Sequence, residues 1–219
     1  MEVIPLMEMT LRWYGSKFDT VTLSQIRQIP GVTGVITTLY DTAPGEVWSR
    51  ERIAALKAEV AAAGLHISGI ESVNVHDAIK TGAPDRDLYI DNYIQTLENL
   101  GKEDIHLVCY NFMPVFDWTR TELARKRPDG STVLAYTQEA VDAINPEEMF
   151  ASIAGDTNGT IMPGWEPERM AHIKELFAMY EDIDDGKLFG NLKYFLARIM
   201  PVCDKYNISM AIHPDDPAW

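Results

Sequence analysis

A histidine after a short apolar run is the residue of this sequence best suited to bind a metal or move a proton. The run 208–212 is followed by His213, Pro214, Asp215 and Asp216. Imidazole is a common metal ligand and titrates near neutral pH, and a nearby carboxylate can orient its ring. The pattern therefore predicts a metal ligand or proton carrier at His213. The alternative is a capped strand end with two solvated acids.

A carboxylate and an imidazole occur together farther upstream. Glu71 closes the apolar run 65–72, and His76 lies on the loop just beyond it. These are the groups that a proton abstraction or an elimination needs, so Glu71 and His76 are candidate catalytic residues. An ion pair for Glu71 and a solvated loop position for His76 are the alternatives.

Other residues suit the binding of a sugar-sized ligand. Asn111 opens an unusually aromatic loop and can bind hydroxyl groups, while Arg120 in the same loop can pair with a carboxylate. Trp13 and Tyr14 end the first apolar run in a similar way. Aromatic walls with few polar groups are typical of small-molecule pockets. These four residues and Asp215 are therefore candidate substrate contacts, with hydrophobic closure of a rim as the alternative reading of the aromatic side chains.

Short apolar runs alternate along the chain with segments of helical period. The expected strands are 9–14, 32–39, 65–72, 105–112 and 208–212. The expected helices are 46–63, 86–100, about 168–180 and 187–206, with a short helix after the capping-box pair Thr22 and Gln25. Arg12, inside the first strand, is expected to have a structural role.

This alternation of strands and helices predicts a parallel sheet with helices packed on it. A doubly wound sheet and a (β/α) barrel both fit, but no glycine-rich phosphate loop follows the first strand. Polar or aromatic residues end nearly all the strands, and in a barrel these ends share the rim where active sites form. A barrel has eight strands in ~250 residues. We therefore predict one incomplete barrel domain over 1–219, with about the first five strands and a long insertion at about 113–167.

Composition limits the partners. The formal net charge is −14, which argues against nucleic acid as a ligand. No apolar run approaches the ~20 residues needed to span a bilayer, and the opening lacks the features of a signal peptide. Two widely separated cysteines, Cys109 and Cys203, indicate a reducing compartment. We expect a cytoplasmic protein without nucleic-acid or membrane partners, in which an anionic substrate needs local cations or a bound metal.

Four stretches of the sequence together resemble the mannonate dehydratase family. They are LRWYG at 11–15, ESVNVH at 71–76, CYNFMPVFDWTRT at 109–121 and AIHPDDP at 211–217. The third is the longest and the most specific. The resemblance runs from about Met9 to the end of the chain. It implies a xylose-isomerase-like (β/α)8 TIM barrel, in agreement with the strand pattern.

The same resemblance implies a metal-dependent reaction: dehydration of D-mannonate to 2-dehydro-3-deoxy-D-gluconate in hexuronate (glucuronate) catabolism. The metal of the family is Mn²⁺ or Fe²⁺, held by a histidine on the fifth strand and then a cysteine, a histidine and an aspartate. His213 matches the first ligand, and the other three are expected beyond Trp219. A small sugar acid is the expected substrate, and a homo-oligomer of the full-length protein is left open. A barrel sugar isomerase or epimerase, and a non-catalytic truncated fragment, are the alternatives.

Overall fold

The computed structural model describes residues 7–115, 120–139 and 173–214. The chain divides into two compact units. The first unit comprises Met1–Phe112 and Asp182–His213, and the second comprises Met113–Glu181 and Pro214–Trp219. None of the helices in the described ranges is long and apolar enough to cross a membrane.

The first unit contains a five-stranded sheet in the order β1-β2-β3-β4-β7. The strands are β1 (Met9–Arg12), β2 (Val32–Thr37), β3 (His66–Glu71), β4 (Leu107–Asn111) and β7 (Ser209–His213). All four neighbouring pairs are parallel. Each new strand is added on the same side of the previous one, whereas a doubly wound sheet reverses its direction. The prediction of a barrel-type sheet is confirmed for these strands, and β1 and β7 are the two edges of the described sheet.

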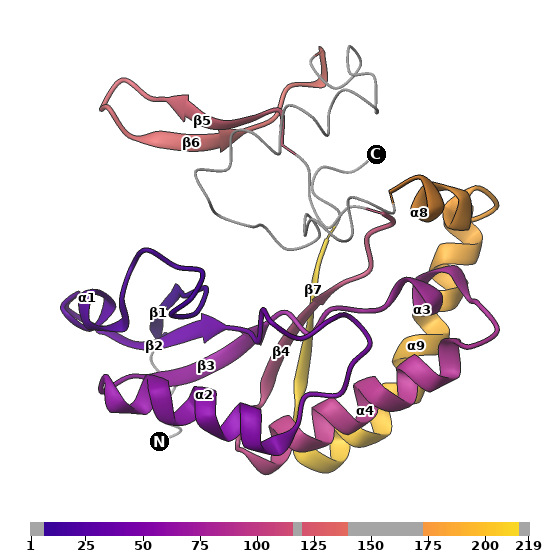
Figure 1. Ribbon diagram of the computed structural model, residues 1–219, viewed down its shortest axis with the longest axis horizontal. Coiled ribbons are helices and arrows are strands. Elements are labelled where there is room, and N and C mark those ends of the chain that lie inside the picture. The colour runs from indigo at the N-terminus through magenta and orange to yellow at the C-terminus, as the bar shows by residue number, and fades with distance from the viewer. Residues whose placement is uncertain (1–6, 116–119, 140–172, 215–219) are drawn as a thin grey trace, which may run out of the picture. The chain divides into compact units, whose positions relative to one another are not determined.

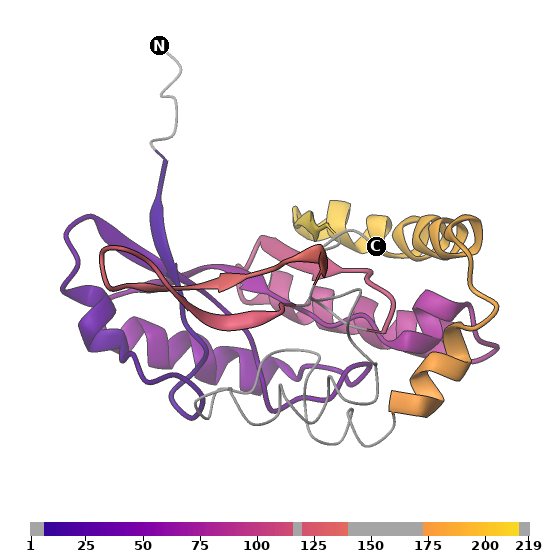
Figure 2. The same cartoon turned by 90° about the horizontal axis from the view of Figure 1, so that it is seen from above.

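The helices of this unit lie between the strands in sequence. They are α1 (Leu23–Arg27), α2 (Arg50–Ala62), α3 (Asp77–Thr81), α4 (Arg86–Lys102) and α9 (Asp185–Tyr206). The long helices α2, α4 and α9 lie on one side of the sheet, with α4 beside α9 (Figures 1 and 2). Arg198 of α9 ties these two helices together by contacting Asp87 and Asp91 of α4.

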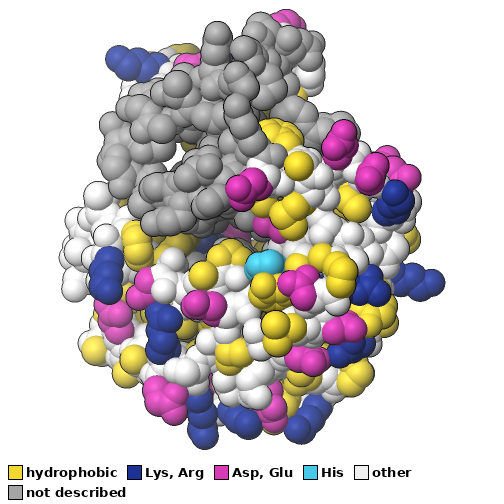
Figure 3. Space-filling view, turned by 45° about the vertical axis from the view of Figure 1, so that its right-hand side comes forward, with side chains coloured by type: hydrophobic (Ala, Val, Ile, Leu, Met, Phe, Trp, Pro, Cys, Tyr) yellow, Lys and Arg dark blue, Asp and Glu magenta, His cyan; other side chains and the backbone are white. Residues whose placement is uncertain are grey.

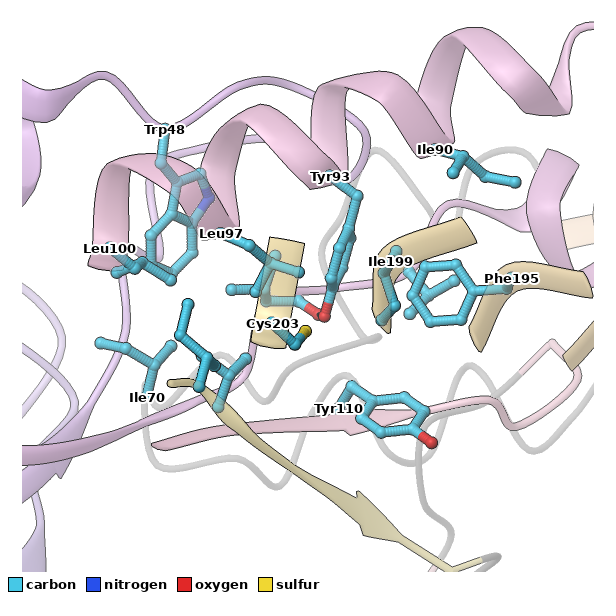
Figure 4. Packing of buried hydrophobic residues seen from close by; sticks show 14 of the residues in the cluster. Trp48, Ile70, Ile90, Tyr93, Leu97, Leu100, Tyr110, Phe195, Ile199 and Cys203 are labelled. Carbon is cyan, nitrogen blue, oxygen red and sulfur yellow. The ribbon is translucent and has the colours of Figure 1, made fainter. Parts of the chain in front are cut away.

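A large apolar core fills the space between β3, β4 and β7 and the helices α4 and α9. Phe195 is fully buried at its centre. The Phe195 ring meets the Tyr93 ring edge to face at 5.0 Å between centroids and the Tyr110 ring at 6.0 Å (Figure 4). A smaller core around Trp13, the residue after β1, packs β2 against α1 and α2. Burial of these aromatic and aliphatic side chains is the main stabilising term of the unit.

Local signals explain several helix ends. The side chain of Thr22 accepts a hydrogen bond from the Gln25 backbone, and the Gln25 side chain accepts one in return, so the predicted capping box is confirmed. Helix α2 begins at Arg50 and not near residue 46, because Ser49 caps it. Helix α9 continues past Pro201 and ends at Asn207, whose left-handed conformation closes the last turn.

In the second unit, β5 (Glu122–Lys126) and β6 (Thr132–Ala135) form an antiparallel hairpin. Its turn contains Gly130 at φ +84°, a conformation that favours glycine, and Asp129 accepts a hydrogen bond from the Ser131 backbone. The two strands that flank this turn were not expected from the sequence. Helix α8 (Ile173–Tyr180) belongs to the same unit. Most of the predicted insertion at 113–167 lies outside the described residues.

Candidate active site

Alternation along the strands gives the sheet one apolar and one polar face. Ile70, Val108, Tyr110 and Met210 pack into the large core on the helix side. Since side chains alternate along a strand, their neighbours in sequence point to the other side. We call this side the polar face; it carries Arg12, Glu71, Cys109, Asn111 and His213. Strand pairing places Glu71 opposite Cys109 and Asn111 opposite His213.

Arg12 joins the ends of three strands on this face. Its Nη1 lies 2.6 Å from Oε2 of Glu71, and its Nη2 donates a hydrogen bond of 2.8 Å to Oη of Tyr40. The guanidinium carbon also lies 5.0 Å from the centre of the Tyr14 ring. Arg12 therefore has the paired position expected of a structural arginine. Glu71 forms an ion pair and still has a side chain that is 40% exposed, so its carboxylate is accessible from solvent.

Two neighbours of this ion pair hold their protons at neutral pH. Burial raises the pKa of Tyr40 to about 12, although the nearby Arg12 charge acts in the opposite direction. Burial, and then the negative charge of Glu71, raise the pKa of the Cys109 thiol. Tyr40 is thus a neutral hydroxyl group that accepts from Arg12 and can donate to a further acceptor. The Cys109 thiol stays protonated, which makes it a weak nucleophile.

Lys80 is a residue of this region that sequence reasoning missed. It lies on the short helix α3, its residue is 2% exposed, and its Nζ lies 3.5 Å from Oδ1 of Asn111. Asn111 is itself buried. A helix of five residues is too short for its period to show which side chains face inward. The one usable signal was the pair Ala78 and Ile79 next to it, which indicates an inward-facing segment.

His76 stands at the start of α3. Its Nδ1 accepts a hydrogen bond of 3.1 Å from the Ala78 backbone, which caps the helix. Its ring stacks on Tyr89, with 3.6 Å between the ring centroids and 9° between the planes. These contacts give His76 a structural task. A catalytic role for it stays a prediction.

The predicted substrate contacts are not all brought together. Trp13 is 2% exposed and lies in the smaller core, on the helix side of the sheet. Tyr14 is half-buried and Asn111 lies on the polar face. Arg120 is half-buried and belongs to the second unit. Asp215 lies outside the described residues.

A pocket of about 250 Å³ lies beside the ends of β1 and β2. Its lining includes aromatic side chains (Tyr14, Phe18 and Tyr40) and charged side chains of both signs (Lys17, Asp41, Arg52 and Glu59). Tyr14 and Tyr40 lie 5.6 Å apart between ring centroids. Since both tyrosines also contact Arg12, the pocket and the polar face share one wall.

The charges on the surface are mixed. On the face shown in Figure 3, acidic and basic side chains are interspersed among apolar ones, without a broad basic patch in the part of that face that is described. An anionic ligand would therefore depend on single cations at its binding site. Arg12 is a basic residue at the carboxyl end of β1, and Lys80 of α3 contacts Asn111 at the carboxyl end of β4.

The described residues do not by themselves form a metal centre. Among residues 7–115, 120–139 and 173–214, no three His, Cys, Asp or Glu side chains lie close enough together to hold a metal ion. His213 is half-buried at the end of β7, opposite Asn111. Its predicted role as a metal ligand is therefore neither confirmed nor contradicted.

Comparison with known proteins adds a family to this geometry. Residues 7–219 match the sequence model of the family described as D-mannonate dehydratase (UxuA). This chain belongs to that family. It is 66% identical over 213 residues to a protein named mannonate dehydratase from Brachyspira hyodysenteriae, covering 97% of this chain and 60% of the relative. It is 54% identical to a mannonate dehydratase of Geobacillus thermodenitrificans, covering 57% of that relative.

A solved structure supports the fold assigned to this chain. The crystal structure of mannonate dehydratase from Streptococcus suis serotype 2 matches with a TM-score of 0.82 and 41% sequence identity, over 96% of this chain and 54% of that chain. The predicted family and the predicted α/β barrel-type fold are thus both confirmed. The chain spans 57% to 60% of the length of these two curated relatives.

Proposed function

We propose that the protein containing this chain is a hydro-lyase that converts D-mannonate into 2-dehydro-3-deoxy-D-gluconate and water. The observation that carries the proposal is the family match over residues 7–219, with relatives named mannonate dehydratase at 66% and 54% identity. A sugar isomerase or epimerase, the alternative reading of the sequence, is not favoured by any of these relatives.

The polar face has groups that suit this reaction. Dehydration removes the proton at C2 and the hydroxyl group at C3, and charge develops on the adjacent carboxylate. Glu71 is an accessible carboxylate that can take up a proton, and Arg12 fixes its position. Tyr40 keeps its proton at neutral pH and can donate a hydrogen bond. Asn111 can bind a sugar hydroxyl group, and Arg120 remains a proposed partner of the substrate carboxylate.

We extend the proposal to a divalent metal, Mn²⁺ or Fe²⁺, with His213 as one of its ligands. A bound metal would act as a Lewis acid that stabilises negative charge on the substrate. The described residues do not complete such a site, so no step of the reaction is assigned to the metal. Hexuronate catabolism is the proposed metabolic context, and a cytoplasmic location stays a prediction from the sequence.

The direct test is a product assay with D-mannonate. The chain as it stands and a version extended to the length of its relatives are each incubated with D-mannonate and Mn²⁺, with and without a chelator. We expect the extended version to form a 2-keto-3-deoxy acid and to lose activity on chelation. Consumption of D-mannonate to an epimer or isomer that keeps every oxygen atom would contradict the dehydratase proposal. Full activity in the presence of chelator would contradict only the metal.

A further inference from the structure

The guanidinium group of Arg12 is held by two groups that come from different strand ends. Its Nη1 lies 2.6 Å from Oε2 of Glu71, at the end of β3, and its Nη2 donates a hydrogen bond of 2.8 Å to Oη of Tyr40, which follows β2. The side chain of Arg12 is 22% exposed, and its Nε is buried. A guanidinium group is a rigid planar fork, so fixing two of its nitrogens fixes its orientation. Tyr40 is one of the two anchors that do this.

Tyr40 is itself well placed to act as an anchor. Its ring contacts the rings of Tyr14 and Phe18, at 5.6 and 5.5 Å between centroids. Burial raises the pKa of Tyr40 to about 12, so its hydroxyl group is neutral at neutral pH. A neutral hydroxyl group accepts a hydrogen bond from Arg12 without adding a second negative charge. In the described part of the chain, the ion pair of Arg12 is therefore made with Glu71 alone.

The Glu71 carboxylate depends on this arrangement for its orientation. Its side chain is 40% exposed, and the terminal torsion of a glutamate is broad, so the carboxylate plane is free to turn unless a partner holds it. A general base must point a lone pair at the proton that it takes, and a displacement of about 1 Å can cost about 100-fold in rate. Without the Tyr40 hydroxyl group, Arg12 keeps one anchor instead of two and can move together with Glu71.

We propose that Tyr40 is a positioning residue for the dehydration: it fixes Arg12, and Arg12 in turn fixes the Glu71 carboxylate that takes the proton from C2. This inference rests on the proposed function, since it takes Glu71 as the group that removes the proton. The role of Tyr40 requires no contact with the substrate. The three side chains come from the ends of the neighbouring strands β1, β2 and β3, so the sheet sets the spacing between them.

The experiment is a double-mutant cycle in the extended protein, with kcat and KM for D-mannonate as the readouts. The four proteins are the wild type, Tyr40→Phe, Glu71→Gln and the double variant. Tyr40→Phe removes only the hydroxyl group and keeps the ring. Tyr194→Phe is the matched control, because the Tyr194 hydroxyl group also accepts a hydrogen bond from an arginine, Arg198, at 3.2 Å and donates one to Asp87, but between α4 and α9 on the helix side.

We expect Tyr40→Phe to lower kcat about 10- to 100-fold and to change KM by less than about twofold, since the substrate still binds but the base is misplaced. In the Glu71→Gln background the same substitution should change kcat by less than about twofold, because no base is left to position. Tyr194→Phe should leave kcat and KM unchanged. The inference is overturned if Tyr40→Phe keeps its kcat, if it changes KM alone, or if it lowers kcat by the same factor in both backgrounds.

A second measurement does not depend on activity. The buried Nε–H of Arg12, assigned in NMR spectra with the variant Arg12→Lys, should exchange with solvent at least about 10-fold faster in Tyr40→Phe than in the wild type or Tyr194→Phe. Equal exchange rates would overturn the inference. A wild type that forms no 2-keto-3-deoxy acid would contradict the dehydratase, while faster exchange in Tyr40→Phe would still support the fixing of Arg12 by Tyr40. Product formation with equal exchange rates would support the dehydratase and overturn the role of Tyr40.

Discussion

The two faces of the parallel sheet are built from alternate residues of the same strands, yet they differ in chemistry. On the helix side, Val108 and Tyr110 of β4 pack against Phe195 and Ile199 of α9. On the polar face, Cys109 and Asn111 of the same strand lie next to Glu71 and His213. One face is a dry core that stabilises the fold, and the other carries charges and hydrogen-bonding groups. Substitutions on the helix side should therefore act mainly on stability, and substitutions on the polar face mainly on function.

The largest expected effect is on the helix side. Phe195→Ala should lower the free energy of unfolding by about 3–5 kcal/mol, because it leaves a cavity at the centre of the large core. Urea unfolding followed by circular dichroism measures this change. Phe189→Ala on the same helix is the control, since Phe189 is 69% exposed and its loss should cost less than about 0.5 kcal/mol. Equal losses in the two variants would mean that α9 does not pack as described.

A smaller effect is expected when the ion pair of the polar face is broken. Arg12→Met removes the contacts to Glu71 and Tyr40 and should lower the free energy of unfolding by about 1–2 kcal/mol. Arg50→Met is the comparison: its ion pair with Glu103 involves a more exposed arginine, so the loss should be at most about 1 kcal/mol. A larger loss in Arg50→Met than in Arg12→Met would show that the polar-face pair is not a specific structural contact.

The smallest effect is the dependence of stability on alkaline pH. The folded-state pKa of Tyr40 is about 12, above its ordinary value of 10.0, so the unfolded chain ionises first. The stabilisation that comes from the protonated Tyr40 hydroxyl group is complete below pH 10 and is lost as the pH rises from 10 to about 12. At pH 10.5 the loss in the free energy of unfolding is less than about 1 kcal/mol. Tyr40→Phe should flatten this part of the curve. Burial also raises the pKa of Tyr93 in the large core, so part of the slope should remain. An unchanged slope in Tyr40→Phe would contradict the burial of its hydroxyl group.

Sequence reasoning located most elements of the first unit because their patterns are long and regular. The helix expected at 86–100 is found as α4, and its apolar residues at helical spacing, Ile90, Tyr93 and Leu97, are buried, while the neighbouring Ile94 is half-buried. The capping box at Thr22 was also found, since it needs residues only three positions apart. Strands were expected one or two residues too long at several ends, because apolar residues continue beyond the last ladder hydrogen bond.

The elements and contacts that the sequence did not predict also have physical causes. The short helix α3 and the strands β5 and β6 lack enough residues to show a period. The contact between Lys80 and Asn111 joins residues 31 positions apart, and no local pattern encodes such a pairing. Trp13 was expected at a rim because it was placed at the carboxyl end of the first strand, but one step of alternation places it in the smaller core. Side-chain direction at strand ends is therefore what the sequence alone leaves open.

The division of the sheet into a stabilising helix side and a chemically active polar face is tested most directly with two variants of the extended protein, Glu71→Gln and Ile199→Val. The measurement is kcat/KM for D-mannonate. Glu71→Gln should lower kcat/KM at least about 100-fold, the usual effect of removing a catalytic acid or base. Ile199→Val should leave kcat/KM unchanged while lowering the free energy of unfolding by about 0.5–1.5 kcal/mol. A Glu71→Gln variant that keeps most of its kcat/KM, or an equal loss in both variants, would contradict the assignment of the chemistry to the polar face.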